Sequence, residues 1–117
     1  MPSLNFTARF SNQVERGIKK QSIRRSWGVP VVIDDALYLF SGMGTYTCKR
    51  LRSTRCYDVA DVFIGSNTSV ILNNRVLTDG EKNELATDEG FDDFKQMFRF
   101  CKQGVGLPFE GQVIKWL

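Results

Sequence analysis

The 117-residue chain contains no histidine, and its three cysteines, Cys48, Cys56 and Cys101, include no CxxC pair. A structural zinc site takes about four closely spaced Cys or His ligands. A disulfide framework usually uses an even number of cysteines. The sequence therefore predicts neither a metal site nor disulfides, and no motif in it indicates a cofactor.

Long apolar runs are also missing. No run approaches the roughly 18 apolar residues of a spanning helix, and the start of the chain, MPSLNFTARF, lacks the apolar core of a signal peptide. We therefore expect no membrane contact and a cytoplasmic location. Apolar residues make up 42% of the chain and charged residues 25%, which is ordinary for a globular protein. The length fits one domain spanning residues 1–117.

The net charge of +3 is unevenly distributed. Two basic clusters, at 9–25 and 49–55, precede an acidic segment at 79–93. The basic clusters predict either a solvated surface or contacts to nucleic-acid phosphates, and aromatic residues beside them either stack on bases or pack in the core. The candidate nucleic-acid residues are Arg24, Arg25, Trp27, Tyr46, Lys49, Arg50 and Arg52.

Hydrophobic periodicity predicts short strands interspersed with two or three short helices, which is an α+β domain around a small curved sheet. Strands are expected in SLNF, QSIRR, ALYLFSG (as a central strand), CYDVADVFIG, TSVILN and LPFEGQVIKWL, and helices in ARFSNQVERG, TDGEKNELATDEGF and DDFKQMFRFCKQ. Gly17 and Gly90 are expected to end helices, and Asn73 with Asn74 to form a turn. The segment GMGTYTCKRLRSTR is predicted to be an irregular basic loop. The expected core includes Leu37, Leu39, Val62, Phe94, Phe98 and Trp116.

The stretch GIKKQSIRR places one hydroxyl, Ser22, among four cations. Two interpretations fit it: a basic turn that contacts phosphate, or a Ser–Lys pair in which an amine activates the hydroxyl. Amide cleavage needs a nucleophile, a base and oxyanion donors. Without histidine, Lys19 is the available base, provided that burial or neighbouring cations lower its pKa. Because residues 19 and 22 of an extended strand point to opposite faces, the chain must bend between them.

The order of these segments resembles the ASCH domain, a member of the PUA-like β-barrel superfamily. The resemblance rests on GIKKQSIR, DDALYLFSGM, ATDEGFDDF and FEGQVIKW, and it spans almost the whole chain. Its strongest motif, G-x-K-x-x-[ST]-x-R, is matched by Gly17, Lys19, Ser22 and Arg24. The middle segment, SGMGTYTCKRL to RCYDV, is most similar to phage-borne versions.

The resemblance implies a cleft that binds RNA or a modified nucleoside. Because Arg24 shares a strand face with Ser22, we expect it to contact a base edge, a phosphate or Glu89. It also implies an alternative, because small bacterial members deacylate N4-acetylcytidine with a lysine, a threonine and a glutamate. By motif these fall on Lys19, Ser22 and Glu89, with serine in place of threonine. Some members are ribonucleases, and the phage resemblance adds a host protein as a further alternative partner, for which the sequence indicates no site.

Overall fold

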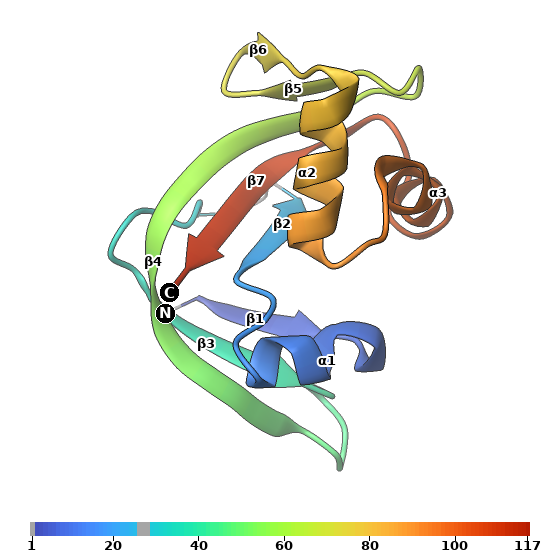
Figure 1. Ribbon diagram of the computed structural model, residues 1–117. Helices are drawn as coiled ribbons and strands as arrows, with labels where there is room; N and C mark the ends of the chain where they lie inside the picture. The colour runs from blue at the N-terminus through green and yellow to red at the C-terminus, as the bar shows by residue number, and fades with distance from the viewer. Residues whose placement is uncertain (1, 26–28) are drawn as a thin grey trace.

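The computed structural model describes residues 2–25 and 29–117 and shows an α+β fold with a mixed, open seven-stranded sheet and three helices (Figure 1). The strands are β1 (Ser3–Phe6), β2 (Gln21–Arg25), β3 (Ala36–Ser41), β4 (Lys49–Ile64), β5 (Val70–Leu72), β6 (Arg75–Val76) and β7 (Phe109–Trp116). The helices are α1 (Ala8–Glu15), α2 (Asp79–Glu89) and α3 (Phe94–Gly104).

Strand β4 pairs with three other strands of the sheet. It is 16 residues long and strongly curved in Figure 1, and it pairs with β3 through its first half and with β7 and β5 through its second half. Its pairing register shifts between Leu39 and Phe40 of β3 and between Cys56 and Asp58 of β4 itself. Such irregularities bend and twist strands. The curved path runs from β1 through β3, β4 and β7 to β2, with only the β1–β3 pair parallel.

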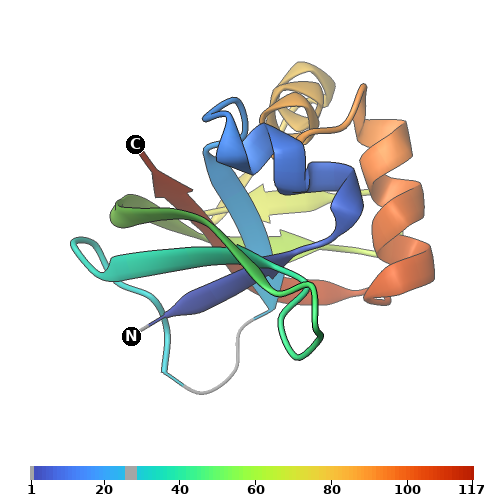
Figure 2. The same cartoon turned by 90° about the horizontal axis from the view of Figure 1, so that it is seen from below.

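The helices cover the open side of the sheet. In the view of Figure 2, α1 and α2 lie along the upper edge and α3 along the right-hand side. Helix α1 buries Phe10 and Val14, which are four residues apart and so lie on one face. Helix α2 begins with a capping box formed by Thr78 and Glu81. Helix α3 packs mainly against α2.

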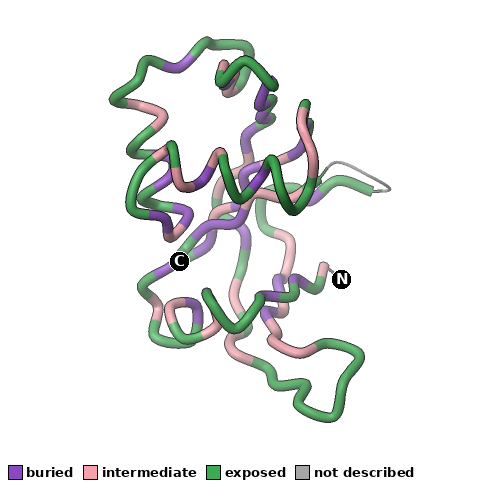
Figure 3. Tube along the Cα trace, turned by 90° about the vertical axis from the view of Figure 1, so that its right-hand side faces the viewer, coloured by how far each residue is buried: buried purple, intermediate pink, exposed green. Residues whose placement is uncertain are grey.

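The burial pattern confirms most of the expected core (Figure 3). Leu37, Leu39, Val62 and Trp116 are buried. Phe94 and Phe98 are only half-buried at the margin of the core, where their rings lie 5.8 Å apart. The expectation that these two rings are largely buried was therefore too strong, because α3 packs on α2 rather than across the sheet.

Most predicted elements are present. The strands at SLNF, QSIRR, ALYLFSG and LPFEGQVIKWL are confirmed, as are the three helices. Strand β3 lies between β1 and β4, inside the sheet as expected, and Asn73 and Asn74 form the β5–β6 turn with φ values of 48° and 66°.

The predicted basic loop was wrong for residues 49–55. They form the first half of β4 and pair with β3, so the expected strand CYDVADVFIG is only the second half of a longer strand. Figure 3 shows that the connection between β3 and β4 is exposed. In residues 2–25 and 29–117, no helix has the length and apolar character needed to cross a membrane.

Candidate functional site

An arginine side chain bridges β1 and β2, which are two of the end strands of the curved sheet. In the described chain, β1 pairs only with β3, and β2 only with β7. Arg24 of β2 reaches across, and its Nη2 donates to the carbonyl oxygen of Asn5 in β1 at 2.8 Å. A cleft of about 230 Å³ lies here, lined by residues of both strands. The candidate site is therefore the opening between two unpaired strand edges.

The Glu89 carboxylate accepts a backbone hydrogen bond from the edge of β2 that faces away from β7. On the other edge, Trp116 N donates to Lys20 O at 3.0 Å. Backbone groups alternate between the two edges of a strand, so those of Gln21, Ile23 and Arg25 point away from β7. The Ile23 N–H donates to Glu89 Oε2 at 3.0 Å. A side chain from α2 thus occupies the place where another strand would pair.

Glu89 reaches β2 because α2 ends at this residue. Gly90 adopts the left-handed conformation, with φ of 105°, and its N–H donates to carbonyl oxygens of the last turn. A Cβ at Gly90 would also lie 3.1 Å from the Phe10 ring, so both conformation and space favour glycine. The stop at Gly90 fixes the Glu89 carboxylate over the edge of β2.

A second left-handed glycine positions Lys19. Gly17 has φ of 75° and follows α1, and the N–H groups of Ile18 and Lys19 both donate to the Gln13 carbonyl oxygen, at 2.8 and 3.0 Å. This turn reverses the chain before β2 begins. Lys19 therefore lies in the connection between α1 and β2, outside the strand that holds Ser22.

Lys19 and Glu89 form a buried ion pair. The Lys19 Nζ lies 3.2 Å from Glu89 Oε2, and it also donates to the Glu89 carbonyl oxygen at the negative end of α2. The ammonium lies 4.9 Å from the centroid of the Phe10 ring. Burial lowers the pKa of Lys19 below its ordinary value, while the Glu89 charge opposes this shift and Arg24 adds to it. A neutral amine is therefore more accessible here than at the surface.

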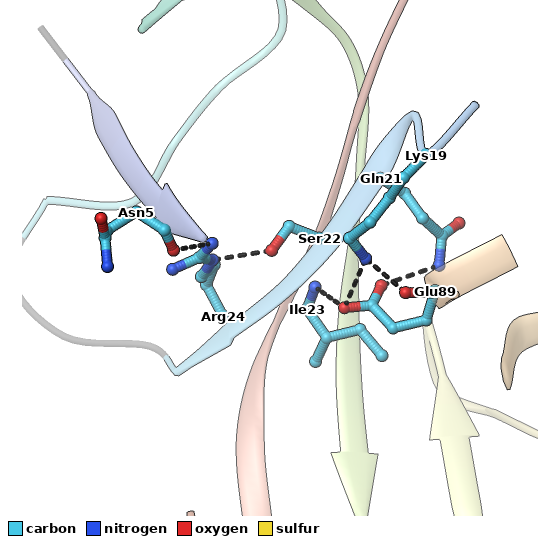
Figure 4. A network of polar contacts seen from close by, with 7 residues as sticks. All are labelled: Asn5, Lys19, Gln21, Ser22, Ile23, Arg24 and Glu89. Atoms are coloured by element: carbon cyan, nitrogen blue, oxygen red, sulfur yellow. Dashed lines mark hydrogen bonds and ion pairs between the residues drawn. The ribbon is translucent and has the colours of Figure 1, made fainter. Parts of the chain in front are cut away.

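Ser22 is held by Arg24 and not by Lys19. Figure 4 shows Ser22 pointing toward Arg24, while Lys19 and Gln21 converge on Glu89. The Arg24 Nε donates to Ser22 Oγ at 2.7 Å. In the described chain no hydrogen bond joins Lys19 to Ser22, and no side chain or carbonyl accepts the Ser22 hydroxyl proton. Ser22 therefore keeps a buried donor available for a ligand.

Every buried polar or charged side chain of the described residues belongs to this one cluster. The four are Lys19, Gln21, Ser22 and Glu89, each less than a tenth exposed. Buried charges and polar groups cost free energy unless they are paired, and buried ion pairs add little net stability. Their concentration beside a cleft is typical of a ligand site.

The cleft combines these polar groups with aromatic walls. The rings of Phe6, Phe10, Phe100 and Phe109 line it. The cleft volume lies below the roughly 300–1,000 Å³ of pockets for drug-sized ligands. The dimensions therefore fit a ligand with a single heterocyclic ring system.

A close strand contact fixes the position of β2. A Cβ at Gly111 of β7 would lie 2.0 Å from the backbone oxygen of Arg24. Only a residue without a Cβ fits this close contact, which lies beside Arg24 and Arg25 of the cleft lining.

The structure separates the other predicted nucleic-acid residues into two groups. Arg25 lines the cleft, where its Nη2 donates to the Val105 carbonyl oxygen at 2.6 Å. The residues on and beside the β3–β4 hairpin do not line it, and Trp27 lies outside the described residues. In this second group Tyr46 and Arg50 are exposed, Lys49 pairs with Glu15 at 2.7 Å, and the Arg52 side chain lies against Gly17.

Sequence reasoning missed several members of the site. Gln21 is buried, and its Nε2 donates to Glu89 Oε1 at 3.2 Å. Asn5 and Phe6 enter from β1, whose place opposite β2 depends on the curvature of the whole sheet. The only signal for Gln21 was its position inside the GxKxxSxR motif, which leaves that position unspecified.

Comparisons of the chain with protein-family models, with curated proteins and with solved structures give no match. Within the part of the chain that the structure describes, no three Cys, Asp or Glu side chains are grouped as metal ligands. The site therefore has to be interpreted from its own chemistry, which offers a hydroxyl, an amine, a carboxylate and two guanidiniums in one cleft.

Proposed function

We propose that the chain is an ASCH-type domain with a PUA-like barrel, and that it binds RNA or a modified nucleoside in the cleft between β1 and β2. Supporting the fold proposal, the strongly curved sheet brings its two end strands together at the cleft. Supporting the function, the motif residues Lys19, Ser22 and Arg24 line that cleft together with Glu89.

The single observation that carries this proposal is that three of the four described buried polar side chains, Lys19, Ser22 and Glu89, line one aromatic cleft. A base presents donors and acceptors on its edge and apolar faces above and below. The buried Ser22 hydroxyl and the Arg24 guanidinium supply polar contacts, and ring walls such as Phe6 and Phe109 supply the apolar contacts. Stacking on an aromatic side chain contributes about 1–3 kcal/mol per base.

Isothermal titration calorimetry with cytidine, N4-acetylcytidine, uridine, adenosine and guanosine tests the proposal. We expect at least one of them to bind with one-to-one stoichiometry. Val105→Trp should abolish binding, because Val105 is 44% exposed on the cleft wall and a large ring there fills the opening. Val76→Trp is the matched control, since Val76 is equally apolar, 64% exposed and located on β6 away from the cleft.

Equal binding by the two tryptophan variants would place the ligand elsewhere. Failure of the unmodified protein to bind any of the five nucleosides, or a short single-stranded RNA, would refute the proposal. Circular dichroism of each variant establishes that the fold is retained.

A second candidate function is amide hydrolysis of an acylated cytosine such as N4-acetylcytidine. The observation that favours it is the burial of Lys19, which lowers the pKa of a potential base in the same cleft as the Ser22 hydroxyl. In this reaction the Ser22 oxygen attacks the acyl carbonyl, Lys19 takes the hydroxyl proton and passes it to the cytosine amine, which leaves. Water then hydrolyses the acyl-serine ester, which releases the acid and restores the Ser22 hydroxyl. Lys19 must first exchange its contact with the Glu89 carbonyl oxygen for one with Ser22.

Release of acetate and cytidine from N4-acetylcytidine, followed by chromatography, tests this candidate. The rate should rise with pH as Lys19 loses its proton. Ser22→Ala should abolish turnover and leave nucleoside binding largely intact, whereas Ser22→Thr should retain or raise the rate. Lys19→Arg should be inactive because a guanidinium keeps its proton, while Lys20→Arg at the neighbouring exposed lysine is the matched control.

Full hydrolysis by Ser22→Ala would exclude Ser22 as the nucleophile. If the unmodified protein binds nucleosides but hydrolyses none across a panel of acylated substrates, the chain is a binding module.

A further inference from the structure

The charges that line the cleft do not balance. Three cations, Lys19, Arg24 and Arg25, line it together with one carboxylate, Glu89. The ion pair with Lys19 already engages that carboxylate. Among the described residues, neither arginine forms an ion pair with any acidic side chain. The cleft therefore holds an excess of positive charge.

Both guanidiniums are held in place by neutral groups. Arg24 donates to Ser22 Oγ and to the Asn5 carbonyl oxygen, and it lies 4.8 Å from the centroid of the Phe6 ring. Arg25 donates to the Val105 carbonyl oxygen and lies 5.3 Å from the centroid of the Phe109 ring. A guanidinium has five N–H donors in a fixed plane. Each arginine thus keeps uncommitted donors in a preset orientation, and neither arginine has an anionic partner.

Without a ligand, holding the half-buried Arg24 guanidinium away from any anionic partner costs free energy. Arg24 is half-buried whereas Arg25 is exposed, and burial lowers the pKa of Arg24 while the Glu89 charge opposes the shift. A partly buried cation without a counter-ion is unfavourable, whereas guanidinium groups bind phosphate oxygens in charge-assisted, often bidentate hydrogen bonds. A side chain that only linked β2 to the Asn5 carbonyl oxygen would need a single uncharged hydrogen-bond donor.

We propose that the ligand of this cleft carries a phosphate group, which Arg24 and Arg25 hold while its base enters between the aromatic walls. This inference rests on the proposed nucleoside-binding function and narrows it to nucleotides or RNA, as distinct from free nucleosides. A nucleoside monophosphate and an RNA phosphodiester share this chemistry. The test below separates these two sources.

The experiment compares four probes by calorimetry at low salt: cytidine, cytidine 5′-monophosphate, the dinucleotide cytidylyl-cytidine and inorganic phosphate. We expect a phosphate to raise affinity about 10- to 100-fold over cytidine, the range that hydrogen bonds to charged groups produce. The gain should shrink as salt is added. Tighter binding of the dinucleotide than of the monophosphate assigns the site to RNA, and the reverse assigns it to a free nucleotide.

Substitutions of the two cleft arginines test where the phosphate binds. Arg24→Gln and Arg25→Gln should each remove most of the gain, measured as the ratio of the affinities for cytidine 5′-monophosphate and cytidine in the same variant. Arg99→Gln is the matched control, because it removes the same charge from an exposed arginine on α3 that does not line the cleft. A gain that survives in both cleft variants would overturn the inference.

The outcomes also separate this inference from the proposed function. If cytidine binds in the cleft and a phosphate adds nothing, the inference fails and the proposed function stands. If inorganic phosphate binds in an Arg24-dependent manner but no nucleoside or nucleotide binds, the anion site stands and the proposed function fails. If none of the four probes binds, the inference fails, and the proposed function fails with it only if N4-acetylcytidine, uridine, adenosine, guanosine and the short RNA do not bind either.

Discussion

Gly111→Ala is expected to weaken both the fold and the candidate site. The new Cβ would lie 2.0 Å from Arg24 O and 2.8 Å from Arg24 C, whereas real Cβ contacts are essentially never closer than 3.0 Å. The obstacle is backbone and cannot rotate away, so β2 and β7 must separate by about 1 Å. Overpacking of this kind costs about 1–3 kcal/mol.

The displaced segment includes the residues that line the cleft. Gly111 pairs with Arg25, one residue from Arg24 along β2. Urea denaturation should therefore show a loss of about 1–3 kcal/mol in the free energy of unfolding, with a fall in melting temperature of about 4 °C per kcal/mol. Ligand affinity should fall together with stability.

Gly104→Ala is the matched control, because a Cβ there meets nothing within 4 Å and the residue lies in α3. We expect this control to be neutral or slightly stabilising, since alanine is the better helix former. If Gly111→Ala unfolds at the same urea concentration as the unmodified protein and binds ligand equally well, the inferred strand contact is wrong.

Three further predictions concern other parts of the chain. The pKa of Glu81 is lowered to about 2, chiefly by its hydrogen bonds with the exposed Arg75 guanidinium; its contribution to stability should therefore be full above the ordinary carboxyl pKa and disappear as the pH falls toward 2. An acid titration that gives Glu81→Gln the same pH dependence as the original protein would contradict this. Thr78→Ala should cost α2 about 1 kcal/mol, measured by urea denaturation, whereas Thr87→Ala in the same helix should cost less. RNA affinity should fall with salt with a log–log slope of about −3 if four phosphates of a single strand are contacted, and Arg50→Glu should flatten that slope if the β3–β4 hairpin takes part; a slope near zero argues against phosphate contacts.

The residues of the sequence motif lie together at the candidate site because most of them act locally. The glycine of the motif, Gly17, ends α1, and the next positions build the turn and the start of β2. Acidic helix α2 was also predictable, with its stop at Gly90, so the placement of Glu89 at a helix end followed from local rules.

What could not be predicted depends on long-range pairing. Residues 49–55 contain a single apolar residue, Leu51, so the period of two that marks a strand is absent, and only pairing with β3 makes them one. Gln21 and Asn5 could not be assigned to the site from the sequence, because their contacts in it are also long-range. Gln21 bonds with Glu89, 68 positions away, and Asn5 is brought to Arg24 by the curvature of the sheet.

One ligand is expected to occupy the cleft between β1 and β2, and amide chemical shifts report its position residue by residue. Titration of the isotope-labelled protein with cytidine 5′-monophosphate should shift the backbone signals of Phe6, Ser22, Arg24 and Gly90 with one common dissociation constant. Signals of the β5–β6 hairpin should stay in place. If these four signals do not move at saturating nucleotide, or if the largest shifts lie on the β3–β4 hairpin alone, the ligand does not bind in this cleft.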